Sequence, residues 1–232
     1  MKRFWGEVVV VQVEGGWQVT LDGRPLKTPQ KRAQVVPTPA LAEALAAEWR
    51  AQSDTVDPAG FVFRDLADYA IDVVAPGRAE AVARLLAFAE TDTLCYRAEP
   101  DEPLAARQRA AWEPLLKAAE ARHGVRFERV AGIVHRAQPA ETLERLHEHL
   151  DKLDAFALAA LHTLAGLAAS LVVALAALEP GADAAALWAA ANLEEDWQAE
   201  QWGVDAEAQA LRARRLAQFE DAARFATLAR FD

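Results

Sequence analysis

The sequence lacks the means to cross-link itself, because it contains only one cysteine, Cys95, among 232 residues. A lone cysteine cannot form an internal disulfide, and an unpaired thiol suits a reducing compartment. We therefore expect an intracellular protein. A chain of this length buries roughly 70 to 75% of its unfolded surface, so a packed core should form without metals or disulfides.

Two further absences narrow the function. Neither G-x-x-x-x-G-K-[ST] nor G-x-G-x-x-G occurs, so no phosphate-binding loop supports nucleotide hydrolysis. Positive charge is also scarce, with 25 Lys and Arg against 35 Asp and Glu and a net charge of −10. The basic residues are scattered, and Lys31-Arg32 and Arg214-Arg215 are only pairs. A phosphate backbone would be repelled, so we expect no nucleic-acid partner.

The amino end does not indicate export. Met1-Lys2-Arg3 resembles the start of a signal peptide, but Glu7 interrupts the apolar segment and no small-residue cleavage site follows. The fold is expected to start almost at Met1, which leaves no room for an organelle transit peptide. We therefore expect a bacterial cytoplasmic protein.

One long uncharged stretch, Ala155 to Leu178, contains 24 residues and is long enough to cross a bilayer as a helix. Acidic residues, Asp154 and Glu179, flank it in place of Lys or Arg, and many of its positions are alanine. A helix that is apolar all round is also what the centre of a helical domain requires. We predict one buried helix and no membrane insertion, with a membrane-inserted helix as the alternative.

The first 37 residues have the pattern of strands. Trp17, Val19 and Leu21 alternate with polar residues at the two-residue period of a sheet. Asp22-Gly23 suits a tight turn, so the strand up to Leu21 should pair with Arg24 to Thr28. The β-branched run from Val8 to Val11 predicts another strand, covered on both faces.

Helical periodicity takes over from Thr38, a good N-cap that precedes Pro39 at the first helical position. The polar segment from Ser53 to Gly60 marks the expected domain boundary. The prediction is an α+β fold with a β-rich domain and one helix in residues 1–60, and a helical domain in residues 61–232.

Four later segments carry apolar residues at helical spacing. Pro114 should kink the second of them or begin a new helix. Their inward stripes are Val82, Leu85, Leu86 and Ala89; Leu104, Gln108, Trp112, Leu115 and Ala119; Leu143, Leu146, Leu150 and Leu153; and Leu211, Leu216, Phe219, Ala223 and Ala226.

Catalytic chemistry finds little support. Cys95 would need a base to form a thiolate, and its neighbours indicate a buried segment. Glu144, His147, Asp151 and Asp154 recur at three or four residues and could share a helix face, as in bundle metal sites. No second such motif occurs, so a solvated charged face is favoured. A small metal-dependent or hydrolytic enzyme stays the alternative, and we expect no metal and no cofactor.

The segment from Leu193 to Asp205 alternates acids and two tryptophans too closely for a simple core stripe. On a helix, Glu195, Gln198 and Trp202 lie at i, i+3 and i+7 and so share one face. An aromatic anchor beside a carboxylate suits recognition of another protein surface. The competing interpretation places Trp197 or Trp202 in the core and leaves the acids solvated.

Five groups of residues form a specific succession along the chain. They are Trp17 to Pro29, Ala47 to Gln52, Thr91 to Arg97, Arg107-Gln108 with Trp112 to Leu116, and Glu195 to Gln198 with Trp202-Gly203. Each group is weak alone, but their order is specific, and together they resemble the assembly chaperones of the F-type ATP synthase, the family that binds the free α subunit of the catalytic head. One departure is Ala169-Ser170, where the family leads us to expect Gly-Ser.

The resemblance implies an amino-terminal β-rich part, a helical carboxyl-terminal part and no enzymatic activity. It also implies that the chain occupies the surface of the α subunit that would otherwise meet the β subunit. We expect the chain to be a monomer. On this hypothesis Trp49 and Arg97 are structural. The partner-binding residues are expected to be Glu195, Asp196, Gln198, Trp202 and Asp205.

Overall fold

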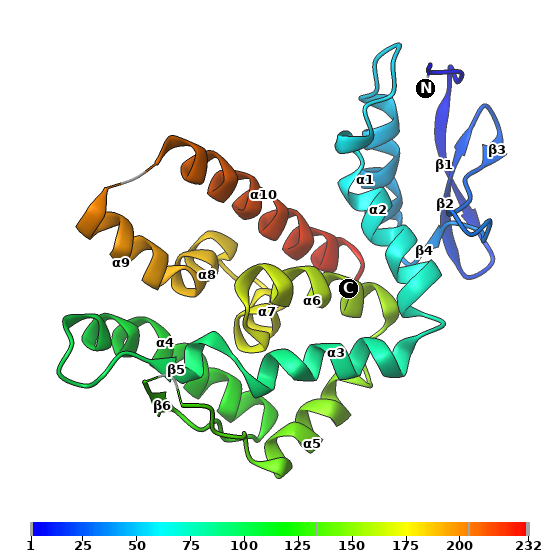
Figure 1. Ribbon diagram of the computed structural model, residues 1–232. Coiled ribbons are helices and arrows are strands. Elements are labelled where there is room, and N and C mark those ends of the chain that lie inside the picture. Colours follow the sequence, from blue (N-terminus) through cyan, green and yellow to red (C-terminus); the bar gives the residue numbers. More distant parts are fainter. Residues whose placement is uncertain (1, 133, 204, 231–232) are drawn as a thin grey trace. The chain divides into compact units, whose positions relative to one another are not determined.

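The computed structural model describes residues 2–132, 134–203 and 205–230, and the chain divides into two compact units. The first unit comprises Met1–Arg78, Asp154–Ala160 and Arg224–Asp232, and the second comprises Ala79–Leu153 and Leu161–Ala223. Antiparallel strands open the chain and helices make up most of the rest (Figure 1). The predicted α+β class is confirmed. The first unit runs past residue 60, and a domain boundary there stays a prediction.

The first unit contains a small sheet of β1 (Val8–Val13), β2 (Gly16–Leu21), β3 (Arg24–Pro25) and β4 (Val35–Val36). β2 is central and pairs with the other three. The predicted hairpin is confirmed, since Leu21 lies opposite Arg24 across a turn in which Asp22 and Gly23 have φ values of 48° and 75°. β3 is shorter than predicted because the chain turns back at Thr28, whose N–H donates to Arg32 O at 2.9 Å.

The prediction that β1 is covered on both faces is wrong. Among the strands that the structure describes, β1 pairs only with β2 and forms an edge of the sheet, and Val9 is 36% exposed and Gln12 is also exposed. Val8 alone in this strand is buried, on the side where β1 contacts α1 (Pro39–Arg50). An edge strand has fewer neighbours to cover it than a central one.

The helical part of the first unit begins as the sequence predicts. Thr38 Oγ1 accepts a hydrogen bond from Leu41 N at 3.1 Å, and Leu41, Leu45 and Trp49 are buried. A 3₁₀ turn (Pro58–Gly60), α2 (Val62–Tyr69) and a π-helical turn (Ala70–Val74) follow. In that last turn the buried Asp72 accepts hydrogen bonds from Thr28 Oγ1 at 2.7 Å and from Gln30 N at 3.0 Å. This carboxylate therefore fixes the loop between β3 and β4.

The second unit is built from α3 (Arg78–Glu90), α4 (Pro103–His123), α5 (Ala140–Leu150), α7 (Leu171–Ala177), α8 (Ala184–Ala191) and α9 (Leu193–Trp202). A 3₁₀ turn (Thr93–Cys95) leads into β5 (Tyr96–Arg97), which pairs in parallel with β6 (Val130–Ala131). α4 continues as one helix through Pro114, so no new helix begins there. Leu116, not Leu115, is the fully buried leucine of that turn.

The sequence predicted one helix for the uncharged stretch, but the structure has two. α6 (Ala155–Ala168) ends before Ala169, whose φ is 48°, and Ser170 caps α7 by accepting from Val173 N at 3.0 Å. Ser170 Oγ also donates to Asp92 at 2.7 Å, and Asp92 accepts from Val172 N at 2.9 Å. Within the described residues, no helix combines the length and the apolar character needed to cross a membrane.

The last helix, α10 (Ala206–Leu228), is buried only in its second half. Phe219, Ala223 and Ala226 are buried as predicted, but Leu211 is 50% exposed. The prediction of one inward stripe from Leu211 onward is therefore wrong at its start. Helical spacing gives the direction of a side chain but not whether another element lies against it.

Candidate functional site

The predicted partner-binding residues lie on α9 and at the start of α10, both in the second unit. Glu195, Gln198 and Trp202 are exposed and share one face of α9, and Trp202 reaches 81% exposure. α9 ends at Trp202, and the capping residue Gly203 has a φ of 87° and donates its N–H to Ala199 O at 2.9 Å. The competing interpretation, Trp197 or Trp202 in the core, is wrong for Trp202, whereas Trp197 is half-buried. A tryptophan side chain can bury a large apolar area, so exposure to this degree is unusual and suits a contact with a partner.

Two of the predicted site residues also have internal roles. Asp196 pairs with Arg212 of α10, whose Nη2 donates to Oδ2 at 2.7 Å. Asp205 caps α10 by accepting from Ala208 N at 3.0 Å. No hydrogen bond or ion pair engages the side chain of Glu195 or Gln198 among the residues that the structure describes. Among the described contacts, Glu195 is therefore the carboxylate of this set that has neither an ion-pair partner nor a capping role.

The opposite face of α9 is anchored to α4. Arg107 Nη1 donates to both carboxylate oxygens of Glu200, at 2.7 and 2.9 Å, and its guanidinium lies 4.4 Å from the centroid of the Trp197 ring. Gln108, which is fully buried, donates to Glu194 at 2.6 Å. These contacts hold half-buried Trp197 against α4 and turn Trp202 outward.

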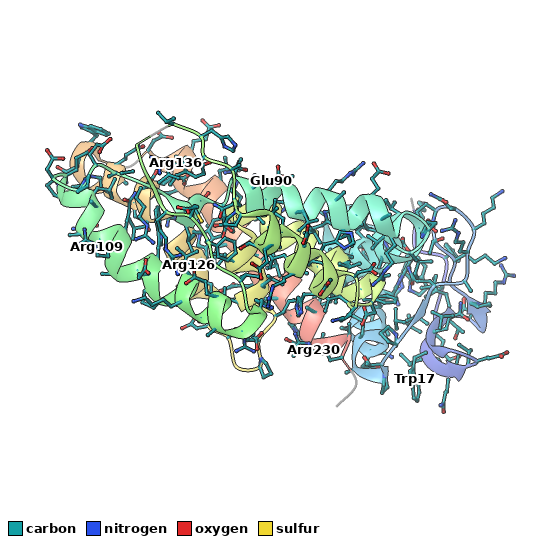
Figure 2. All side chains as sticks on the ribbon, turned by 90° about the horizontal axis from the view of Figure 1, so that it is seen from below. Trp17, Glu90, Arg109, Arg126, Arg136 and Arg230 are labelled. Atoms are coloured by element: carbon teal, nitrogen blue, oxygen red, sulfur yellow. The ribbon has the colours of Figure 1, made fainter. Side chains whose placement is uncertain are left out.

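The end of α8 is also tied to α4, because the fully buried Trp112 donates its indole N–H to Ala190 O at 2.7 Å. Residues on the other side of α4 point to solvent, and Arg109 projects from that exposed side (Figure 2). α4 thus serves as the support on which α8 and α9 are mounted.

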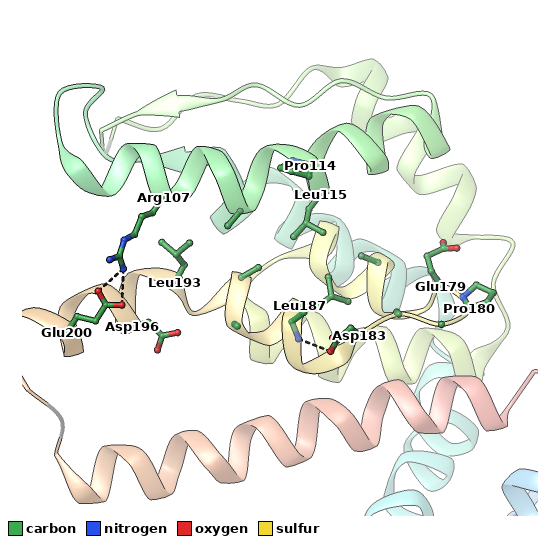
Figure 3. Close-up of a pocket in the computed structure, with 17 residues that line it drawn as sticks. Arg107, Pro114, Leu115, Glu179, Pro180, Asp183, Leu187, Leu193, Asp196 and Glu200 are labelled. Atoms are coloured by element: carbon green, nitrogen blue, oxygen red, sulfur yellow. Dashed lines mark hydrogen bonds and ion pairs between the residues drawn. The ribbon is translucent and has the colours of Figure 1, made fainter.

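A groove of about 790 Å³ opens between α4 and the α8–α9 segment (Figure 3). Twelve of its seventeen lining residues are apolar or glycine, and six of those are alanines. The charged lining residues are Arg107, Glu179, Asp183, Asp196 and Glu200. Of the predicted partner-binding residues, only Asp196 lines this groove. The groove is formed by segments about 70 residues apart in the sequence, so helical spacing within one segment could not predict it.

A simple charge count points to the same region. Residues 153–211 contain no Lys or Arg but nine acids, so this stretch of 59 residues carries −9 of the net charge of −10. All of α9 and four of the five charged residues that line the groove fall within it. The nine acids are Asp154, Glu179, Asp183, Glu194, Glu195, Asp196, Glu200, Asp205 and Glu207.

The residues considered for catalysis or metal binding lie outside this groove. Cys95 is buried, and that burial raises the pKa of its thiol to about 12, so the nucleophilic thiolate is strongly disfavoured at neutral pH. Glu144, His147, Asp151 and Asp154 are all exposed. Over residues 2–132, 134–203 and 205–230, no group of three or more His, Cys, Asp or Glu side chains is arranged to hold a metal ion.

Arg97 has the structural role expected of it. Its Nη2 donates to Glu113 at 2.9 Å, and Glu113 also accepts from Arg129 at 3.1 Å. Arg129 pairs further with Glu120, and the hydrogen bonds from the arginines hold the pKa values of both glutamates below their usual range despite partial desolvation. This network joins β5 and the segment before β6 to α4.

Comparison with known proteins fits this architecture. Residues 2–120, just over half of the chain, match the family model described as ATP12 chaperone protein. The chain belongs to the ATP12 chaperone family. The resemblance to the assembly chaperones of the F-type ATP synthase is thereby confirmed at the level of the family.

Individual ATP12 relatives match over most of their length. The mitochondrial protein atp12 of Schizosaccharomyces pombe is 29% identical over 214 residues, which span 87% of this chain and 74% of that protein. The crystal structure of Atp12 from Paracoccus denitrificans is 39% identical, with a TM-score of 0.93 over 99% of this chain and 98% of the other. The ATP12 fold therefore covers both units described here.

Proposed function

We propose that this chain is an assembly chaperone that binds the free α subunit of the F-type ATP synthase catalytic head. It would cover the α-subunit interface until the β subunit takes its place. The observation that carries the proposal is the exposed Trp202 on the same helix face as the uncompensated Glu195, in a member of a chaperone family.

The physical case rests on what an unassembled subunit exposes. Its subunit interface is a large apolar area that would self-associate in water, so a temporary partner must shield it. Tryptophan supplies contact area at low entropic cost, and a neighbouring carboxylate favours one orientation of a basic partner surface. α9 presents both, and its anchoring to α4 limits the ordering that binding would require.

The chain is proposed to act by binding alone. Family members are named as chaperones, and Cys95 offers no reactive thiolate. We further propose that it works as a monomer in the bacterial cytoplasm, without a nucleic-acid partner and without membrane insertion. The high negative charge disfavours both phosphate backbones and anionic lipid surfaces.

Co-purification with separately expressed α and β subunits tests the proposal. The chain should retain the α subunit and leave the β subunit unbound, and addition of β should release it from α. Retention of β alone, or of neither subunit, would contradict the proposal. Stoichiometric metal together with turnover of a small molecule would instead support the enzyme alternative.

A further inference from the structure

The groove between α4 and α8 exists because small side chains face each other across it. Ala186, Leu187 and Ala189 of α8 line the groove; the two alanines are exposed, whereas Leu187 is buried. Ala111 and Pro114 line it from α4. Alanine ends at Cβ, so neither helix fills the space between them, and about 790 Å³ remains (Figure 3). That is within the range of sites that take a sizeable apolar ligand.

The floor of the groove is apolar and its rim is negative. Four carboxylates line it against a single base, Arg107, which is itself engaged by Glu200. Glu179 pairs with Arg122 and Asp196 with Arg212, so both are largely neutralised. Asp183 caps α8 through Ala186 N at 3.0 Å, and within the described part of the chain no cation pairs with it. The groove therefore has uncompensated negative charge at one end.

The groove is continuous with the proposed contact face. Leu193, Asp196 and Glu200 of α9 line it, while Glu195 and Trp202 lie on the free face of the same helix. A partner that covers the free face of α9 would thus reach the groove across one helix.

We propose that this groove receives an apolar segment of the α subunit that carries a lysine or arginine. The inference rests on the proposed function and names the element of the partner that the chaperone holds. The apolar side chains of the segment fill the space above the alanines, and its basic residue lies near Asp183. A second copy of this chain fits poorly, because its residues 153–211 bring nine more acids and no Lys or Arg.

A single cysteine placed in the groove reports on its occupant. Ala186→Cys puts a thiol in the groove, and Ala185→Cys puts a matched thiol on an exposed position of the same helix outside it. The native Cys95 is buried and contributes little background. The probe is a maleimide, and its labelling rate is measured with and without the purified α subunit.

With the α subunit at about ten times its dissociation constant, labelling of Ala186→Cys should slow about tenfold. Labelling of Ala185→Cys should change less than about twofold under the same occupancy. Equal protection of both thiols, or of neither, overturns the proposal. Protection that rises with the concentration of the chain alone would assign the groove to a second copy, and protection by anionic vesicles would assign it to a membrane; either result overturns it.

Filling the groove is an independent test. Ala186→Leu should weaken α-subunit capture at least about tenfold, whereas Ala185→Leu should leave it unchanged, with thermal midpoints measured for both. If capture persists while the groove thiol stays unprotected, the groove assignment fails and the proposed function stands. If the unaltered chain does not capture the α subunit at all, both fail.

Discussion

The guanidinium of Arg107 lies 4.4 Å from the centroid of the Trp197 ring and also donates to both carboxylate oxygens of Glu200. One side chain of α4 thus holds two residues of α9 that lie on the same side of that helix. Trp197 is half-buried as a result, and Trp202, on the other side, is 81% exposed. This relationship assigns the two tryptophans different roles.

Removing that anchor should loosen α9. In Arg107→Ala, the cation–π contact, worth about 0.5 to 1 kcal/mol at exposed sites, is lost together with the ion pair to Glu200. Amide hydrogen exchange in α9 should accelerate and α-subunit capture should weaken, while exchange in α7 should not change. Arg109→Ala is the matched control, because Arg109 lies on the exposed side of the same helix (Figure 2). The same exchange rates in both variants would contradict the anchoring role.

Trp202 should matter for binding and not for folding. Because the side chain is 81% exposed, Trp202→Ala should change the free energy of unfolding by less than about 0.5 kcal/mol. Capture of the α subunit should weaken by about 2 kcal/mol or more if this tryptophan is an anchor. Trp188→Ala, at a 3% exposed position, should instead destabilise the fold by about 3 to 5 kcal/mol. Denaturant unfolding and titration calorimetry separate the two effects.

Charge reversal at Glu195 should weaken capture without unfolding the chain. Glu195→Lys replaces an exposed, uncompensated carboxylate with a positive charge. The new lysine should repel a basic surface of the partner and so lower the affinity. Glu144→Lys, at an exposed position of α5, makes the same change in net charge and is the control. Affinity of the unaltered chain should also fall as salt rises, since the Debye length is already only about 8 Å at 0.15 M. Identical affinities for both variants would move the contact away from α9.

Asp92 should make stability depend on pH. Burial raises the pKa of this carboxyl to about 6, against the hydrogen bonds from Val172 N, Ser170 and Leu94 N that favour its ionised form. The same carboxyl has a pKa near 3.8 in the unfolded chain. Between pH 3.8 and about 6 the folded chain therefore keeps a proton that the unfolded chain has released, and this proton stabilises the fold. The stabilisation is lost as pH rises from about 4 to 6. The expected loss is about 3 kcal/mol. Denaturant unfolding at a series of pH values measures it.

Asp92→Asn separates this titration from the hydrogen bonds. The amide cannot accept at both positions, so its NH₂ faces either Val172 N or Leu94 N. At about pH 4, where the native carboxyl is protonated in the fold, stability should therefore fall by about 1 to 3 kcal/mol. The loss of stability between pH 4 and 6 should then be reduced. An unchanged pH profile in this variant would show that another group titrates in that range.

Local sequence signals predicted much of the first unit and the helices. The hairpin follows from Asp22-Gly23, and the start of α1 follows from Thr38 and Pro39, because these features depend on residues a few positions apart. The shared face of Glu195, Gln198 and Trp202 follows equally from the 3.6-residue period. The α+β class and the resemblance to the family were also available from the sequence alone.

Contacts between distant residues decided the rest. The helix is interrupted at Ala169, and Ser170 caps the next helix, α7. Asp92, 78 residues before Ser170, accepts hydrogen bonds from Ser170 and Val172 at this point. Arg107 reaches Glu200 across 93 residues, and the groove needs α4 and α8 to meet through alanines. Periodicity fixes the direction in which a side chain leaves its own helix, but only the packed fold determines whether a partner, a cavity or solvent lies there.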